Sequence, residues 1–344
     1  MPIYQLRPQD MDILDRFWAR TVLTVGADTT RALYQKESYR LGTMVSSSAP
    51  ETPFVCNLPS DVWKHSFLAH LMMAVTLQHD RATSPDPSAP PSAAELFHTA
   101  QGTALYNSRL ANSDSCSSSE LDALWIGSAF LGVVSFAYVE ARTPAEAWPL
   151  QPRPASEPHW MTIGDGKKEV WRISDLTRQD SSLTKFVQPV VDVFVTVSAT
   201  PTRGELCNIP PEIVQFLELD NPETQQSNPR FGPAIALSRL MPLEYNSTTI
   251  LKFVLFHMQM EPEFRDLLDM KDPGAMLLLA YWYAKVSKYQ QWWTWRRAIL
   301  ECQAICIYLR RYHPDLPHLG VALRYPESVC GGFGGITVHG RQLQ

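Results

Sequence analysis

Apolar residues recur three and four positions apart from one end of the chain to the other, and alternating polar and apolar runs are scarce. The first spacing places side chains on one face of an α-helix, whereas alternation is typical of a half-buried strand. Near the N-terminus, for example, Met11, Leu14, Trp18 and Val22 follow the helical spacing. The pattern therefore predicts an all-α fold.

Capping residues mark where several of these helices begin. Ser60 is expected to cap the apolar helix that follows it, and Ser119 with Asp122 forms an acidic version of the capping box. Asp272 precedes Pro273, an arrangement that suits an N-cap followed by the first helical position. We therefore expect helices to start at these three places.

One β-branched segment, residues 183–199, resembles strand sequence. Phe186, Val190 and Val193 nevertheless keep helical spacing. A proline inside a helix kinks it, because the residue lacks the N–H of the hydrogen-bond ladder. We therefore predict a helix kinked at Pro189.

Three segments interrupt the helical pattern. Residues 82–92 are rich in proline and serine, residues 143–166 carry five prolines and two tryptophans, and residues 330–344 are rich in glycine. Such compositions are typical of loops. We expect a large single-domain helical array, a ligand-binding domain over residues 1–344, with two surface loops and a glycine-rich tail.

Composition narrows the classes of function. The chain is 45% hydrophobic and 19% charged, and its net charge is −5. This allows a large core but gives no basic surface, so we expect this chain not to bind nucleic acid itself. The longest apolar run, Ala275 to Ala284, covers about half a membrane span, and the N-terminus has no signal-like apolar segment. A soluble protein of the cytoplasm or nucleus, without a membrane span, is expected.

The cysteines and histidines do not have the spacing of a metal site. Cys302 and Cys306 lie four apart, with His313 and Cys330 after them, but structural zinc uses close-spaced ligand pairs that are missing here. Buried, reduced cysteines are the simpler interpretation. We predict no metal and no cofactor, because nucleophile-elbow, phosphate-loop and dinucleotide motifs are also missing. Among the histidines, His70 lies in the most apolar surroundings.

The segment from Gln290 to His313, "QQWWTWRRAILECQAICIYLRRYH", is the most distinctive of the sequence. Its apolar residues form a wide helical stripe, so it predicts a helix that packs against two neighbours. Arg296, Arg297 and Glu301 are the charged minority. Arg297 and Glu301 lie four apart and can pair on the helix. We expect this pair to be structural, with a role in a pocket or in catalysis as the alternative.

Helices rich in aromatic residues and methionine, without catalytic motifs, are typical of an apolar ligand site. The chain also resembles a known family, in "DPGAMLLLAYWYAKVSKYQQWWTWRRAILECQAICIYLRRYH" (272–313), "VWKHSFLAHLMMAVTLQHD" (62–80) and "LDALWIGSAFLGVVSFAYVEARTPAEAWPL" (121–150). These segments resemble the C-terminal sterol-sensing regulatory domain of fungal binuclear-zinc-cluster transcription factors of the sterol uptake control type. The resemblance extends over nearly the whole chain.

The resemblance implies an all-helical, often dimeric domain whose hydrophobic pocket takes ergosterol or a related sterol. Sterol binding would keep the factor in the cytosol, and sterol depletion would release it to the nucleus to activate sterol genes. The six-cysteine zinc cluster that binds DNA in this family has no counterpart here, because the chain begins with Met1 at the regulatory region. The chain is then either an excised domain or a stand-alone descendant.

Helix faces give the candidate ligand-binding residues, each of which has core packing as its alternative. They are Phe67, Leu71, Phe130, Val134, Met258, Met276, Leu279, Tyr283 and Trp292, with Gly331, Gly332, Gly334 and Gly335 as a lid.

Two other functions stay open. A cyclase or isomerase of a terpenoid or polyketide intermediate could use the same scaffold, with His70, Tyr283, Arg296 and Glu301 as its polar groups. A helical adaptor that binds protein partners would need a large exposed apolar patch instead.

Overall fold

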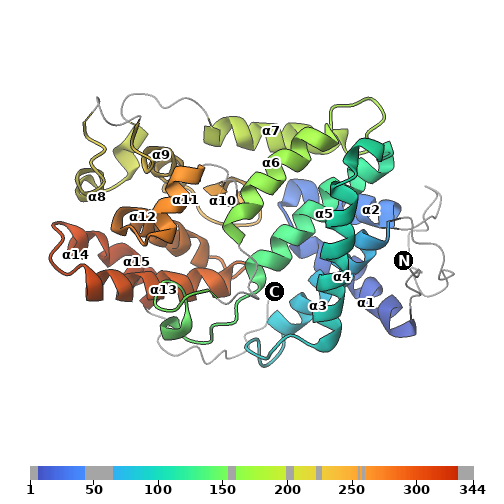
Figure 1. Cartoon of the computed structure of the whole chain (residues 1–344), viewed down its shortest axis with the longest axis horizontal. Coiled ribbons are helices and arrows are strands. Elements are labelled where there is room, and N and C mark those ends of the chain that lie inside the picture. Colours follow the sequence, from blue (N-terminus) through green and yellow to red (C-terminus); the bar gives the residue numbers. More distant parts are fainter. Residues whose placement is uncertain are drawn as a thin grey trace. The chain divides into compact units, whose positions relative to one another are not determined.

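The structure is a computed structural model that describes residues 7–42, 65–153, 160–198, 205–221, 227–254, 256–257 and 260–331. Helices form its regular structure, and no strand occurs in these ranges (Figure 1). The predicted all-α fold is therefore confirmed. Ser60, Met258 and residues 332–344 of the glycine-rich tail lie outside the described residues.

The contacts divide the described residues into two compact units. The first unit holds the residues up to Ser135 together with Asp165–Val191, and the second holds Phe136–Gly164 and the residues from Asp192 onward. Each unit has buried apolar residues of its own.

The helices that begin before Asp192 are α1 (Pro8–Ala19), α2 (Asp28–Gly42), α3 (Ser66–Ala82), α4 (Ala93–Leu110), α5 (Ser118–Ala137), α6 (Ile163–Ser174) and α7 (Thr184–Ser198), with short 3₁₀ turns η1 (Thr21–Thr24), η3 (Ser113–Ser115), η4 (Pro144–Glu146) and η5 (Trp160–Thr162). Pro189 lies inside α7, so the predicted helix over the β-branched segment is confirmed. Residues 83–92 connect α3 to α4 without a helix, as predicted.

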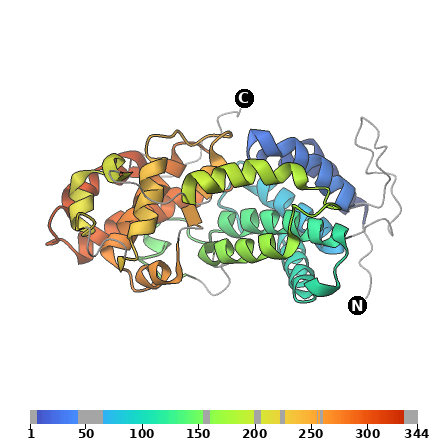
Figure 2. The same ribbon diagram turned by 90° about the horizontal axis from the view of Figure 1, so that it is seen from above.

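Close packing of α3 against α4 organises the first unit. Gly102 of α4 makes the contact, because a Cβ atom there would lie 2.8 Å from Leu71 Cδ2 and 3.2 Å from the Leu71 backbone nitrogen. α5 and α6 run alongside one another (Figures 1 and 2), and their Trp125 and Trp171 rings meet edge to face at 5.2 Å. This pairing places residues of α4, α5 and α6 around a common space.

The helix starts differ from the sequence prediction in detail. The capping box of α5 is formed by Ser117 and Glu120, since the Ser117 backbone donates to Glu120 Oε2 at 2.8 Å and the Glu120 backbone to Ser117 Oγ at 3.4 Å. The predicted box of Ser119 and Asp122 is therefore wrong. Asp122 is buried instead, where it accepts hydrogen bonds from Arg178, Ser181 and Ser182.

One helix among the described residues, α5, is long and apolar enough to cross a membrane by length and composition. In this structure 67% of its most apolar window is buried inside the protein. Burial of this kind is typical of the core helix of a globular fold.

The second unit contains η6 (Glu205–Asn208), α8 (Pro211–Phe216), α9 (Phe231–Leu240), α10 (Ile250–Val254), α11 (Pro262–Asp269), α12 (Pro273–Ser287), α13 (Trp295–Tyr312), α14 (Leu319–Ala322) and α15 (Arg324–Cys330). Every residue of α12 from Gly274 onward is buried, and α13 and α15 pack on it. Asp272 caps α12 by accepting from the Ala275 backbone at 2.8 Å, which confirms the predicted start.

The expected surface loop over residues 143–166 contains buried tryptophans. Trp148 and Trp160 are buried, and the Trp160 ring meets those of Phe136 and Trp282 with centroids 4.9 and 6.0 Å apart. Large rings bury much apolar area even in a proline-rich segment without long helices. This segment is therefore partly core, and the loop prediction is wrong for these two tryptophans.

Candidate functional site

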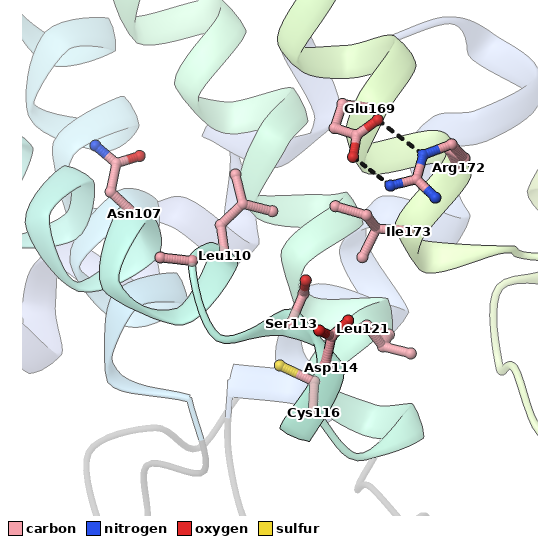
Figure 3. A pocket seen from close by; sticks show the side chains of 10 residues that line it. Asn107, Leu110, Ser113, Asp114, Cys116, Leu121, Glu169, Arg172 and Ile173 are labelled. Atoms are coloured by element: carbon pink, nitrogen blue, oxygen red, sulfur yellow. Dashed lines mark hydrogen bonds and ion pairs between the residues drawn. The ribbon is translucent and has the colours of Figure 1, made fainter.

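An open pocket lies in the first unit where the C-terminal end of α4, the turn η3, the start of α5 and the end of α6 meet (Figure 3). Its volume is about 740 Å³. The lining residues are Asn107, Leu110, Ala111, Ser113, Asp114, Cys116, Leu121, Glu169, Arg172 and Ile173. This volume falls within the range of roughly 300–1,000 Å³ that is usual for small-molecule sites.

The pocket is lined by both aliphatic and polar side chains. Leu110, Leu121 and Ile173 come from three different helices and are half-buried. Leu110 and Ile173 extend toward one another in Figure 3, and Leu121 lines the same pocket. Glu169 and Arg172 pair beside them, with Arg172 Nε 2.9 Å from Glu169 Oε2. The hydrogen bond from Arg172 lowers the pKa of Glu169, so the pair is charged at neutral pH.

Cys116 contributes a thiol to the same pocket. Burial raises the pKa of this thiol, and its sulfur lies 3.8 Å from the Asn112 carbonyl oxygen. A raised pKa lowers the fraction of the nucleophilic thiolate at neutral pH. Cys116 therefore adds a mostly protonated thiol to the pocket wall.

The predicted ligand-binding residues lie elsewhere. Phe67, Leu71, Phe130 and Val134 are buried in the first unit, whereas Met276, Leu279 and Tyr283 are buried in the second. Trp292 is half-buried and Gly331 is exposed; Met258, Gly332, Gly334 and Gly335 lie outside the described residues. None of the described members lines the pocket of Figure 3.

A buried ionic network centred on Glu301 occupies the second unit. Glu301 Oε2 accepts from the Tyr283 hydroxyl at 2.7 Å and from Arg153 Nη2 at 2.9 Å, and Oε1 accepts from Arg297. Arg297, Glu301 and Tyr283 are almost completely inaccessible to solvent. The helical pair that the sequence predicted is thus buried and has two further partners.

Arg297 also ties α13 to the C-terminal end of α5 and the residues that follow it. It donates to the backbone oxygen of Phe136 at 2.9 Å and to that of Tyr138. Its neighbour Arg296 is half-buried and donates to the Ala141 oxygen at 2.9 Å. Both arginines therefore brace the same segment, but it is Arg297 that enters the Glu301 network.

The protonation states in this network are fixed by its charges. Burial alone raises the pKa of Glu301, but Arg153, Arg297 and the hydrogen bonds outweigh it, so the pKa is lowered. Burial and the Glu301 charge hold the pKa of Tyr283 well above its usual value. At neutral pH the network thus has an ionised carboxylate with both oxygens engaged and a neutral phenol, which is the arrangement of a structural brace.

A second buried polar cluster lies in the first unit. His70 Nδ1 and His98 Nδ1 are 2.9 Å apart, and His98 Nε2 lies 3.6 Å from Asp10 Oδ1. Burial lowers the pKa of His70 to about 4, with a further contribution from His98, and burial also lowers the pKa of His98. Both imidazoles are therefore neutral at pH 7, and one ring donates a hydrogen bond to the other.

The four polar groups proposed for catalysis do not form one cluster. Tyr283 and Glu301 meet, Arg296 binds a backbone oxygen, and His70 belongs to the other unit. In the described part of the chain, no group of three His, Cys, Asp or Glu side chains has the geometry to hold a metal ion.

The sequence did not single out the residues that line the pocket. Leu110, Leu121 and Ile173 stand near helix ends, and they meet only through the packing of α4, α5 and α6. The serine-rich stretch before α5 was the one signal of a turn there. Comparison with protein families, with curated proteins and with solved structures finds no match for this chain.

Proposed function

We propose that the chain binds a sterol or a similar apolar terpenoid in the pocket of Figure 3, as the regulatory domain of a fungal transcription factor. The observation that carries the binding proposal is an open volume of about 740 Å³ that is lined by both aliphatic and polar side chains. The regulatory role rests on the sequence resemblance.

A sterol is a rigid hydrocarbon with a single hydroxyl group. Contact with Leu110, Leu121 and Ile173 would remove its apolar surface from water, which contributes roughly 25 cal/mol per Å² buried. The Ser113 hydroxyl and the Asp114 carboxylate lie on the same pocket wall and offer partners for the ligand hydroxyl. The rigid ligand also loses little conformational entropy on binding.

In this proposal the partners are the sterol and a second copy of the chain, and this chain itself does not bind nucleic acid. The ligand-bound chain stays in the cytoplasm, and loss of the sterol sends it to the nucleus.

No specific observation favours the alternative function as a cyclase or isomerase. Glu301 has both carboxylate oxygens engaged, and the Tyr283 hydroxyl donates a hydrogen bond to that carboxylate. His70 shares a hydrogen bond with His98, with their Nδ1 atoms 2.9 Å apart.

The test is a titration of the folded chain with ergosterol, followed by tryptophan fluorescence and by mass spectrometry of the intact complex. We expect about one sterol per chain, as is usual for a single small-molecule pocket. Ala111→Trp fills the pocket from its exposed wall and should weaken binding at least tenfold, or by about 1.4 kcal/mol.

Ala104→Trp is the matched control, because Ala104 is an exposed alanine of α4 that does not line the pocket. It should leave the affinity unchanged. A folded chain that binds no sterol refutes the proposed ligand. Sterol binding that Ala111→Trp leaves unchanged refutes this pocket as the site.

A further inference from the structure

Three buried thiols belong to the second unit, and none of them lines the pocket. Cys302 and Cys306 belong to α13, Cys330 ends α15, and all three are buried. Helices α13 and α15 pack on one another, and burial, followed by hydrogen bonding to Cys306 and Cys330, raises the pKa of the Cys302 thiol. The site is fixed further by Gln303 Nε2, which donates to the Cys330 backbone oxygen at 2.6 Å.

Only one of the two cysteines near Cys302 can form a disulfide with it without distorting a helix. Residues four apart on an α-helix have Cβ atoms about 5–6 Å apart, whereas a disulfide needs about 3.5–4.5 Å. Cys306 therefore cannot bond to Cys302 without distorting α13. Cys330 comes from a separate helix, so its position is not tied to that spacing.

Cys330 is also the more nucleophilic member of the pair. Hydrogen bonds from Cys302 and Ser287 lower the pKa of its thiol, and Ser287 Oγ lies 3.5 Å from its sulfur. Burial raises the pKa of Cys302, whose sulfur lies 3.4 Å from the Ala280 oxygen. The thiolate is the reactive form of cysteine, so Cys330 should react first.

α15 is the element whose opening would expose this pair. It is a short helix, held by the solvent-accessible Arg310–Glu327 ion pair and by the packing of Tyr325 on the buried Tyr281 ring, with ring centroids 5.1 Å apart. Helices held in this way open locally at a lower free energy than core helices. A small oxidant can reach Cys330 in such an opening.

We propose that Cys330 and Cys302 form a reversible disulfide when the chain meets hydrogen peroxide, and that this bond fastens α15 to α13. The Cys330 thiolate attacks one peroxide oxygen, the O–O bond breaks, and the departing hydroxide takes up a proton to leave as water. The Cys302 sulfur then attacks the sulfenic sulfur, and the S–O bond breaks. Water leaves with the Cys302 proton. One pair of electrons passes from the two thiols to the peroxide, and a dithiol reductant reverses the reaction.

The experiment uses the full chain, reduced with dithiothreitol, freed of reductant and treated with hydrogen peroxide. Remaining thiols are alkylated, and the chain is digested with trypsin without reduction. Cleavage after Arg297, Arg310 and Arg324 separates Cys330 from a peptide that holds both Cys302 and Cys306. We expect a disulfide-linked pair of these peptides, which dithiothreitol abolishes, and slower hydrogen exchange across α15 in the oxidised chain.

Variants identify the partner of Cys330. Cys306→Ser should keep the linked peptides, and Cys302→Ser should lose them. Should a variant fail to fold, fragmentation of the linked wild-type peptides assigns the bonded cysteine directly. Oxidation of Cys330 to a sulfinic acid without a link, a bond through Cys306, or no reaction at Cys330 while the exposed Cys207 is oxidised would each overturn the proposal.

Discussion

The two units each bury a polar network, but they do so with opposite electrostatics. In the second unit the Glu301 carboxylate stays ionised between Arg153 and Arg297, with Tyr283 as a further donor. In the first unit His70 and His98 stay neutral and share one hydrogen bond. The comparison shows two ways to keep polar groups inside a helical core.

The two solutions make different demands on the surrounding structure. Removing a charge from water is costly, so a buried carboxylate needs several charged or hydrogen-bonding partners. A neutral imidazole needs fewer partners, but it stays neutral only while the pH is above its pKa. The Glu301 network should therefore be sensitive to the loss of a partner, and the His70 pair to acid.

The largest effect should come from removing one partner of Glu301. Arg297→Met takes away a guanidinium that is completely buried and leaves Glu301 with an unmatched oxygen. We expect a loss of about 3–5 kcal/mol in the free energy of unfolding, measured with urea, as for other broken buried ion pairs.

Arg311→Met is the matched control, since Arg311 is an exposed arginine of the same helix. It should change the free energy of unfolding by less than about 0.5 kcal/mol. Equal losses for the two variants would mean that the ionic network does not stabilise the second unit.

A smaller effect is expected from acid on the first unit. The pKa of His70 is about 4 in the folded chain against 6.5 for an unperturbed histidine. Between these values the unfolded chain binds more protons, so stability falls as the pH drops from 6.5 toward 4 and is independent of this group above 6.5. Between pH 7 and pH 5 the loss from His70 should be about 1–2 kcal/mol.

Urea unfolding of wild type and His70→Asn at several pH values measures this contribution. Because His79 also has a pKa lowered to about 4 by burial, the wild type alone does not isolate His70. The variant should show a shallower fall of stability with acid, since its amide does not titrate. Parallel pH profiles for the two chains would contradict the neutral buried pair. Because the pKa of Glu301 is lowered, its carboxylate stays ionised and keeps stabilising the second unit at a pH where His70 already loses stability.

The comparison also separates what the sequence could predict from what it could not. Spacing alone indicated that Arg297 and Glu301 pair, because both lie on one helix. Arg153 lies 148 positions from Glu301, and His98 lies 28 positions from His70. Contacts of this kind depend on how helices pack, which periodicity does not specify.

The sequence predicted correctly several features that depend on residues close together in the chain. The Asp272 cap, the proline inside α7 and the all-α fold follow from short-range rules. The cap of α5 was misplaced by two residues, because Ser117 and Ser119 both stand in a run of serines and only the packing of Asp122 on Arg178 decides between them. The pocket was missed, since its walls come from three helices with no shared motif.

The N-caps of α12 and α4 allow a further comparison between a charged and a neutral group. In the second unit, Asp272 caps α12 and forms a bidentate pair with Arg230, with contacts of 2.9 and 2.6 Å. Asp272→Ala should cost about 2 kcal/mol, the upper end for a lost cap, because Arg230 also loses its partner. Urea unfolding measures the change, and a loss below that of a neutral cap would show that the ion pair contributes nothing.

The smallest effect belongs to the neutral cap in the first unit. Ser92 Oγ accepts from the Glu95 backbone at 3.1 Å at the start of α4 and has no charge to leave behind. Ser92→Ala should cost about 1 kcal/mol, and Ser92→Gly only a few tenths, because glycine leaves the backbone of the cap accessible to water. The order Asp272→Ala above Ser92→Ala above Ser92→Gly follows if charge pairing adds to capping. If Ser92→Ala lowers the free energy of unfolding as much as Asp272→Ala does, both losses come from the missing caps alone. The electrostatic difference between the two units would then not extend to their helix ends.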